Sequence, residues 1–503
     1  MRRIPPTIAS QHPDNALPPY WDKAKQAFIG AYSEMAEAVS CFQELGVSEY
    51  MWDWEGKHAD AAVIDRLFSE YYDYFSKVQL GRDKFLTFRI PNIWEEKGYN
   101  LLQAMTVVLS GEDFARDLKF QQRPLFEMIL PMTERADQLE HMQELFQKLA
   151  HFKSEQFTAD QPANNDYLEM IPLVESVESQ LAVADLLTEY VAMHQKHFKR
   201  KLEYIRVFFA CSDSSLTSGL LAGILANKLL VIRLYEFQKR TGIKIFPFAG
   251  PGSLRFRGGL SPYTIDRFLQ EYSGVRTVTV QSAFRYDNPI EDVKAAIAKL
   301  ETELPKTPIP TLSADKQARL VAISEQSAKL YRSTIKQIAD DMQVYFKAVP
   351  KRRDRRQHIG LVAYARSMGE QTLPRAITFT AAFYSIGVPP EFIAFGRSLG
   401  NLSPADLELL KTVYPNIASD LEAAGRYFNA DNLEALAKAN PAWQRIQEDV
   451  QSVQTVLEID LGPQTDDEKA HRKLTTAALA LKDDPAMLGE VITKAAVLRR
   501  SLG

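Results

Sequence analysis

The sequence predicts an α/β protein built on a (β/α)8 barrel of the TIM type, embedded in additional α-helices. Three observations point to this fold class. Short runs of β-branched and aromatic residues alternate with helical patterns over residues 40–300. The centres of these runs lie roughly 35 to 42 residues apart, enough for one strand, one helix and two loops. The runs also lack a regular alternation of apolar and polar residues, as is typical of parallel strands that are buried on both faces.

Seven strands are predicted in this part of the chain, and they would form barrel βα units 1–7 over residues 40–300. An eighth strand is expected at Arg375–Thr380, within a strand 8 region of residues 371–399, because this run is again β-branched and aromatic. The seven other predicted strands are Ser48–Asp53, Phe85–Ile90, Leu125–Pro131, Tyr167–Val174, Tyr204–Ala210, Lys244–Ala249 and Val275–Gln281.

Helices account for the rest of the predicted architecture. A helical insertion over residues 301–370 fills the gap before the eighth strand, with Ser313 as the N-cap of a long helix. Residues 400–503 show a helical pattern and form a C-terminal helical region. We expect the whole chain, residues 1–503, to be a single catalytic unit.

An open, doubly wound parallel sheet is the alternative fold, because it also contains βα repeats. Such sheets that bind dinucleotides carry a Gly-x-Gly-x-x-Gly turn after the first strand, and this chain has no such turn there. The barrel is therefore the preferred prediction.

Composition limits the class of protein. The chain of 503 residues is 46% hydrophobic and 25% charged, which is ordinary for a globular protein and argues against disordered, collagen-like and coiled-coil classes. A net charge of −4 argues against a nucleic acid or an anionic membrane as the partner of the whole surface.

Two cysteines, Cys41 and Cys211, cannot form a disulfide framework and fit a reducing compartment. There is no signal peptide, and the uncharged stretch Ala376–Pro390 is too short to span a bilayer. We expect a cytoplasmic protein.

In a barrel enzyme the catalytic groups lie at the carboxyl ends of the strands. Glu175 follows the fourth predicted strand and Asp213 the fifth, and these two carboxylates are candidate ligands for a hard divalent cation. Acidic residues at these positions could instead cap the helices that follow. Arg89 closes the second predicted strand and Arg375 opens the eighth.

The stretch Gly250–Gly259 contains four glycines, one serine and two arginines, Arg255 and Arg257. Glycine lets backbone N–H groups approach an oxyanion, and arginine adds forked donors that match phosphate. The stretch is not a P-loop, because the Gly-Lys-Ser/Thr ending is absent. A tight turn with solvated arginines is the alternative interpretation.

Two further features have a structural and a functional interpretation each. His12 lies on a proline-containing segment near the N-terminus, where a lone histidine is more often structural than catalytic. The basic run Lys351–Arg356 is typical of a solvated loop, and a subunit contact or an anion site is its functional alternative.

Taken together, these motifs resemble the archaeal-type phosphoenolpyruvate carboxylases, and they follow one another in that family's order over most of the chain. The similar segments are Gln11–Asn15, Asp53–Lys57, Arg89–Asn92, Ile171–Glu175, Ser212-Asp213, Gly252–Gly258, Gln281–Asp287, Pro374–Ile377 and Ser501–Gly503. The resemblance implies a barrel among helices, a homotetramer, and carboxylation of phosphoenolpyruvate by bicarbonate to oxaloacetate and phosphate, an anaplerotic fixation of carbon. It implies a reaction through carboxyphosphate and a metal-stabilised pyruvate enolate, with Mg²⁺ or Mn²⁺ and without biotin or a nucleotide.

The resemblance also implies roles for individual residues. Glu175 and Asp213 would bind the metal. The catalytic residues would be His12, Arg89, Arg257 and Arg375, and the substrate-binding residues would be Lys57, Gly252, Ser253, Gly258, Arg285 and Gly503. The chain departs from the family pattern at three positions, with Cys211 in place of arginine, Arg255 in place of proline and Gly259 in place of histidine. Another metal-dependent lyase or phosphotransferase that forms a pyruvate enolate on a TIM-type barrel is the alternative function, and a non-catalytic scaffold is the third.

Overall fold

The computed structural model describes residues 2–21, 30–55, 59–95, 98–157, 166–350, 366–368 and 371–503. For residues 366–368, 371 and 372 it describes the backbone alone. Among the described residues no helix is both long and apolar enough to cross a lipid bilayer.

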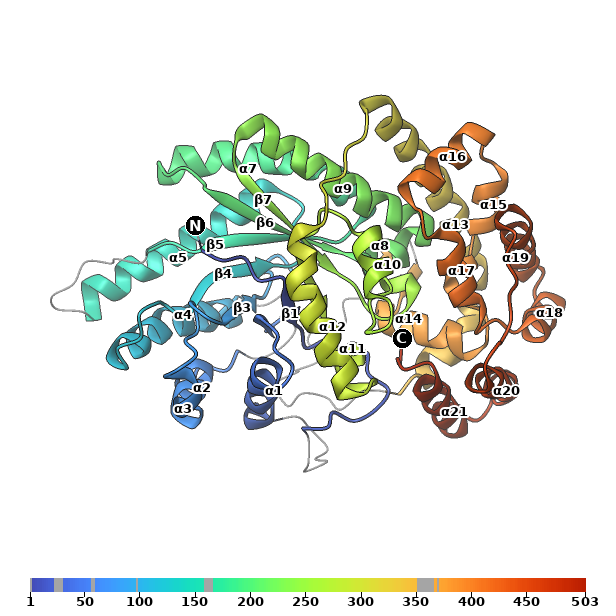
Figure 1. Cartoon of the computed structure of the whole chain (residues 1–503), viewed down its shortest axis with the longest axis horizontal. Helices are drawn as coiled ribbons and strands as arrows, with labels where there is room; N and C mark the ends of the chain where they lie inside the picture. The colour runs from blue at the N-terminus through green and yellow to red at the C-terminus, as the bar shows by residue number, and fades with distance from the viewer. Residues whose placement is uncertain are drawn as a thin grey trace.

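Eight parallel strands form a closed barrel in sequence order, so the predicted fold class is confirmed (Figure 1). The barrel closes where β1 pairs with β2 on one side and with β8 on the other; Ile8 lies opposite Glu49 and Thr279. The strands are β1 (Thr7–Ala9), β2 (Glu49–Asp53), β3 (Phe85–Arg89), β4 (Leu125–Leu130), β5 (Glu169–Val174), β6 (Tyr204–Ala210), β7 (Lys244–Gly250) and β8 (Thr277–Val280).

The eighth predicted strand was placed wrongly. Residues 376–385 form a helix, α14 (Ala376–Ser385), and the remaining barrel strand is β1 near the N-terminus. Phe379 and Phe383 are four residues apart and stack in α14 with their ring centroids 4.7 Å apart, and both contact Phe346. The aromatic and β-branched run therefore has helical spacing. The strand 8 region of residues 371–399 contributes no strand to the barrel.

The amino-terminal end of the barrel is filled by a buried ionic layer. Arg206 of β6 forms ion pairs with Glu49 of β2 and Glu127 of β4, each with N–O distances of 2.7 Å, and Arg2 also pairs with Glu127. Thr277 of β8 completes this layer, so its members come from alternate strands, as in other barrels of this type. Because this end of the barrel is filled, we expect an active site at the carboxyl ends of the strands, as in other barrels of this type.

The middle of the barrel is apolar. The rings of Phe208 and Phe248 stack with centroids 3.9 Å apart. Six more residues fill the interior with them: Ile8, Met51, Ile129, Ile171, Leu173 and Ala210.

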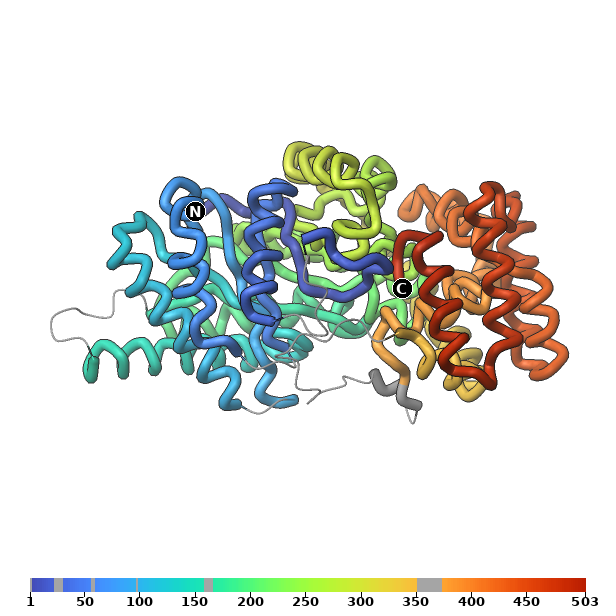
Figure 2. The backbone as a smooth tube through the Cα atoms, turned by 90° about the horizontal axis from the view of Figure 1, so that it is seen from below, coloured from blue at the N-terminus to red at the C-terminus, as the bar shows by residue number. Residues whose placement is uncertain are grey.

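Helices surround the barrel, and a second group of helices forms its own core beside it, as both views show (Figures 1 and 2). The helices around the barrel are α1 (Ala31–Gln43), α2 (Val63–Glu70), α3 (Tyr72–Phe75), α4 (Tyr99–Asp117), α5 (Ala136–Phe157), α6 (Val177–Leu181), α7 (Val183–Phe198), α8 (Cys211–Ser218), α9 (Leu220–Thr241), η1 (Arg255–Arg257), α10 (Ile265–Glu271), α11 (Ser282–Tyr286) and α12 (Ile290–Glu303).

The second group begins with the long helix α13 (Ala314–Ala348), whose N-cap is Ser313 as predicted. The chain is also helical after residue 400, as predicted. This group further contains α14, α15 (Phe395–Gly400), α16 (Pro404–Val413), α17 (Ile417–Gly425), α18 (Ala430–Ala439), α19 (Gln444–Leu457), α20 (Asp466–Ala480) and α21 (Pro485–Leu498). A hairpin of β9 (Arg366–Met368) and β10 (Gln371–Leu373) precedes α14.

Candidate active site

Arg89, the last residue of β3, lies between two carboxylates from the carboxyl end of β2. Its Nε donates to Asp53 Oδ1 at 2.9 Å and its Nη2 to Asp53 Oδ2 at 2.5 Å, while Nη1 lies 2.8 Å from Glu55 Oε2. Burial opposes the charge, but Asp53, Glu55 and the nearby Glu175 together raise the pKa of Arg89. Arg89 is therefore a permanently charged group fixed at the carboxyl end of the barrel.

His12 reaches the same end of the barrel because it lies just after β1. Its Nδ1 is 2.9 Å from Ser10 Oγ, and the residue is partly exposed. Desolvation lowers the pKa of His12 to about 3, and the cations Arg89 and Arg257 act in the same direction, while the carboxylates of Asp53 and Asp213 oppose them. The imidazole is thus neutral at physiological pH and can accept a proton.

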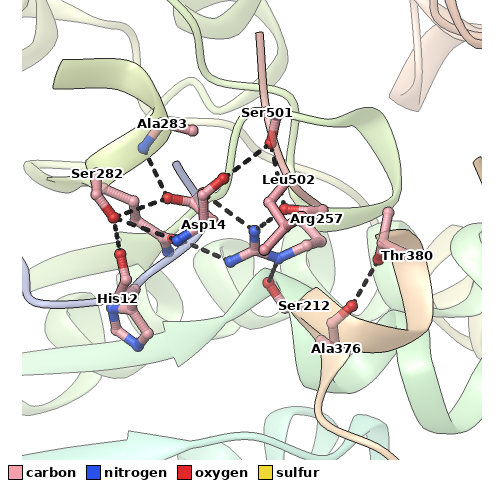
Figure 3. Close-up of polar contacts among 12 residues, drawn as sticks. His12, Asp14, Ser212, Arg257, Ser282, Ala283, Ala376, Thr380, Ser501 and Leu502 are labelled. Atoms are coloured by element: carbon pink, nitrogen blue, oxygen red, sulfur yellow. Dashed lines mark hydrogen bonds and ion pairs between the residues drawn. The ribbon is translucent and has the colours of Figure 1, made fainter. Parts of the chain in front are cut away.

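Arg257 lies at the end of η1, in the loop that follows β7, and its side chain is 2% exposed (Figure 3). Its Nε donates to Ser212 Oγ at 3.2 Å, its Nη1 to Asp14 Oδ2 at 3.0 Å and its Nη2 to Gln281 Oε1 at 2.6 Å. Nη1 also donates to the main-chain oxygen of Gly503. The predicted anion-binding arginine is therefore the point where four segments of the chain meet.

The glycines of this loop allow it to close around Arg257. A Cβ at Gly252 would lie 2.7 Å from Arg257 Cζ. Gly258 has a φ of +108°, in the region that favours glycine, and a Cβ there would lie 2.8 Å from Pro251. Ser253 Oγ is buried and has no hydrogen-bond partner among the described residues. Gly252 and Gly258 thus serve the packing of the loop, while the Ser253 hydroxyl is available to a ligand.

The C-terminal residues are docked beside this loop. Leu502 is 2% exposed, and its N–H donates to the carbonyl oxygen of Asp14 at 2.7 Å. A Cβ at Gly503 would overlap the carbonyl oxygen of Ile377 in α14 and lie 2.9 Å from Ala381 N. Glycine is therefore the residue that fits at position 503, next to Arg257.

Glu175 and Asp213 lie at the carboxyl ends of the neighbouring strands β5 and β6, which pair at Val174 and Phe209. The N-cap of α6 is Ser176, whose side chain accepts from the N–H of Ser179, so Glu175 does not cap this helix. Asp213 is in the first turn of α8. The carboxylates act electrostatically on the other predicted site residues, Glu175 on Arg89 and Asp213 on His12.

This donor set fits a magnesium-type ion. Within the described ranges no group of three or more His, Cys, Asp or Glu side chains is arranged to hold a metal. A Zn²⁺ site would need such a group. Mg²⁺ is commonly held by one or two carboxylates, with water and substrate oxygens as its other ligands. Glu175 and Asp213 are hard oxygen donors of that kind.

Two further predicted residues, Arg285 and Arg375, are among the described residues. Arg285 is fully buried, and its guanidinium donates to Ser10 O at 2.6 Å and to Cys41 Sγ at 2.7 Å and pairs with Glu37 at 3.2 Å. These contacts join α11 to α1 and to the main chain of Ser10, whose side chain contacts His12, so Arg285 is a packing residue beside the site. Arg375 is exposed at the N-cap of α14. Lys57 and the basic run 351–356 lie outside the described residues.

Two of the three departures from the family pattern depend on each other. Arg255 packs across the loop and forms an ion pair with Asp420 of α17 at 3.1 Å. A Cβ at Gly259 would overlap the Arg255 side chain, at 2.8 Å from both Cδ and Cζ. Gly259 also has a φ of +72°. With arginine at position 255, the space for a side chain at position 259 is taken.

Reasoning from the sequence alone missed several residues of the site. Asp14, Ser212 and Gln281 all contact Arg257, and Asp53 holds Arg89. Each lies inside a motif that the sequence analysis singled out. The signal was thus present, but the sequence does not show which distant partner each side chain meets.

Comparison with known proteins gives a consistent result over the whole chain. Residues 4–503 match a family model described as phosphoenolpyruvate carboxylase. Three proteins with that name are similar to this chain: one from Leuconostoc mesenteroides subsp. mesenteroides (52% identity, covering 100% of this chain and 99% of the relative), one from Oenococcus oeni (49%, 100% and 99%) and one from the archaeon Metallosphaera sedula (34%, 100% and 100%).

Proposed function

Because the chain belongs to the phosphoenolpyruvate carboxylase family and is an enzyme of that type, we propose that it converts phosphoenolpyruvate and bicarbonate to oxaloacetate and phosphate. One structural observation links this proposal to particular residues. His12, Arg89, Arg257, Glu175 and Asp213 lie at the carboxyl end of a barrel whose other end is closed by the Arg206 layer.

The charges of the site suit the meeting of two anions. Unit negative charges about 4 Å apart repel each other by roughly 4 kcal/mol at an effective dielectric constant of about 20. Arg89, at the end of β3, can donate hydrogen bonds to a substrate anion, because it has N–H groups beyond those that Asp53 and Glu55 use. Glu175 and Asp213 would hold a Mg²⁺ or Mn²⁺ ion, which when bound supplies further positive charge against the charge of the substrates.

We propose that His12, which is neutral at physiological pH, acts as the general base. In the proposed reaction, bicarbonate attacks the phosphorus of phosphoenolpyruvate and gives carboxyphosphate and the enolate of pyruvate. The neutral His12 then takes the proton from the carboxyl group of carboxyphosphate, which releases CO₂ and phosphate. His12 Nδ1 lies 2.9 Å from Ser10 Oγ; in the tautomer in which Nδ1–H donates to this oxygen, the lone pair is on Nε2, which can accept the proton. The enolate carbon then attacks CO₂ and forms oxaloacetate.

The reaction also requires that water is kept away from the enolate, because a proton from water would turn it into pyruvate. The packing of Leu502 and Gly503 beside Arg257 supports this requirement, since it places buried main chain and a leucine side chain next to the site. Ser253, whose buried hydroxyl has no partner among the described residues, is our candidate for a contact to the phosphoryl group.

We further infer a homotetramer in the cytoplasm, following the family resemblance. The decisive experiment on the function is an assay for oxaloacetate with purified enzyme, phosphoenolpyruvate, bicarbonate and Mg²⁺, and with no nucleotide. Formation of oxaloacetate supports the proposal. A requirement for ADP would indicate a phosphotransferase, and the absence of turnover under both conditions would indicate a scaffold. Light scattering of the eluting protein measures the tetramer.

A further inference from the structure

We propose that Asp14 is a positioning residue. It holds His12 and Arg257 in the arrangement in which the enolate reacts with CO₂ and is not protonated to pyruvate. This inference rests on the proposed function. Asp14 is fully buried and lies two residues after His12. Figure 3 shows it between the start of α11, the Arg257 guanidinium and the C-terminal residues.

The carboxylate of Asp14 joins two parts of the site. Its Oδ2 accepts from Arg257 Nη1 at 3.0 Å, and its Oδ1 accepts from the N–H of Ala283 at 2.7 Å and lies 3.2 Å from Ser282 Oγ. Gln281, the N-cap of α11, makes no side-chain capping bond, so Asp14 serves the first turn of that helix. A buried guanidinium needs such a partner, because an unpaired charge in the interior is costly.

The main chain around Asp14 fixes the segment that carries His12. The N–H of Asp14 lies 3.1 Å from the carbonyl oxygen of His12, and Ser282 Oγ donates to that same oxygen. Pro13 restricts the backbone between the two residues. Because Ser282 also contacts the Asp14 carboxylate, the His12 backbone is held by α11 on one side while its ring is held by Ser10 on the other.

Asp14 therefore acts on the reaction through His12 and Arg257. Asp14→Asn keeps the size of the side chain and an oxygen for Ala283 N–H, but it removes the charge that faces Arg257. The main-chain bond from Leu502 to the Asp14 carbonyl remains possible in the variant. The substitution thus tests the carboxylate separately from the docking of the C-terminal residues.

The test measures oxaloacetate, pyruvate and phosphate together in the full-length enzyme. We expect Asp14→Asn to lower oxaloacetate turnover about tenfold or more. We also expect it to raise the pyruvate share, which is the amount of pyruvate formed per phosphate formed. This share does not depend on the fraction of folded enzyme, so loss of stability alone leaves it unchanged. A share equal to that of the wild type would overturn the proposal.

Asp449→Asn is the matched control. Asp449 is also fully buried, pairs with an arginine (Arg397, 2.8 Å) and accepts from a backbone N–H (Ala394, 2.8 Å), but it lies in α19 in the C-terminal core. We expect this variant to lose stability with an unchanged pyruvate share.

If Asp14→Asn does not fold, Ser282→Ala decides the question, because it removes the hydroxyl between His12 and Asp14. An unchanged pyruvate share in Ser282→Ala would likewise overturn the role of Asp14. Absence of oxaloacetate with the wild type would refute the proposed function itself, whereas a normal wild type with an unchanged share in the variants refutes the role of Asp14 alone.

Discussion

The main-chain oxygen of Gly503 accepts a hydrogen bond from Nη1 of Arg257, a residue 246 positions earlier in the chain. Residues at chain ends are commonly frayed, yet here Ser501, Leu502 and Gly503 are all buried. Their partners are Arg257 and Asp14, which lie in the loop after β7 and in the segment after β1. The C-terminal residues are thus packed against two segments of the predicted site.

Gly503→Ala should lower turnover about tenfold, or about 1.4 kcal/mol of transition-state stabilisation, with little change in the melting temperature. The added methyl group would overlap the Ile377 carbonyl oxygen, so residue 503 must move away from Arg257. Removal of Leu502 and Gly503 should have at least this effect. Gly30→Ala is the control, because a Cβ at Gly30 has no atom within 4 Å. Unchanged kcat in both site variants would show that the docked tail is dispensable.

Glu175→Gln or Asp213→Asn should reduce metal-dependent turnover about a hundredfold or more, equivalent to about 2.7 kcal/mol, with little loss of fold. An amide keeps the shape of the carboxylate but is a poor ligand for Mg²⁺. The measurement is the rate of oxaloacetate formation as Mg²⁺ is titrated. Glu178→Gln, an exposed residue in the adjacent helix α6, should behave as the wild type. Normal metal dependence in both site variants would contradict the assignment.

His12→Asn should separate the two halves of the reaction. Carboxyphosphate should still form slowly when bicarbonate is present, because attack on phosphorus does not use His12, and its hydrolysis by water gives phosphate. Oxaloacetate should fall much further, because the proton on carboxyphosphate has no acceptor in the site and CO₂ is not released beside the enolate. Both products are measured in the same reaction. His151→Asn, at an exposed position on α5, is the control. An equal loss of phosphate and oxaloacetate would place His12 in the first step.

Glu391 should make the protein less stable as the pH rises from about 4.5 to about 7. Burial raises the pKa of this carboxyl from 4.5 to about 7, and its Oε2 has no hydrogen-bond partner among the described residues. Between these values the folded state binds the proton and the unfolded state does not, so stability falls with pH and then levels off. The loss amounts to roughly 3 kcal/mol.

Glu391→Gln should remove this slope, since the amide oxygen can still accept from the N–H of Phe256 and the hydroxyl of Tyr384. Denaturant unfolding of wild type and variant at pH 5 and pH 8 provides the comparison. Glu408→Gln, with a side chain 76% exposed, should follow the wild type. Equal pH slopes for the wild type and Glu391→Gln would show that Glu391 titrates normally.

The coupling of Arg255 and Gly259 can be measured with a double-mutant cycle. Gly259→Ala should cost more stability with Arg255 present than in an Arg255→Ala background, because the overlap with the arginine exists only in the first case. The strain from the positive φ is common to both backgrounds and cancels. We expect a coupling energy of about 1 kcal/mol or more, as for other residues in contact. Additive effects would show that the two positions are independent.

The sequence predicted the barrel and seven of its strands to within a few residues, because each of those strands lies in a mostly buried run of β-branched and aromatic residues at regular spacing. It missed β1, since three residues are too few to show a pattern. It misplaced the eighth strand because the aromatic residues of α14 are favoured in strands and in buried helices alike.

For the site, the motifs indicated segments that the structure brings to the carboxyl end of the barrel, but they did not indicate the contacts of these segments. Arg257 and Arg285 both lie in motifs that resemble the family. Arg257 donates hydrogen bonds to Asp14 and Gly503. The guanidinium of Arg285 instead contacts Ser10, Cys41 and Glu37. The difference is set by long-range packing between segments hundreds of residues apart. A local pattern in one sequence does not contain this information.

The short strand β1 also has a consequence for how the chain folds. It is the first strand to be synthesised, but it completes the barrel by pairing with both β2 and β8, so its place exists only after β8 has joined the sheet. Until then β2 and β8 are open edges, which are prone to pair with other chains. Such non-local pairing is slow. Insertion of β1 is therefore the step that both removes the open edges of the sheet and brings His12 to the carboxyl end of the barrel.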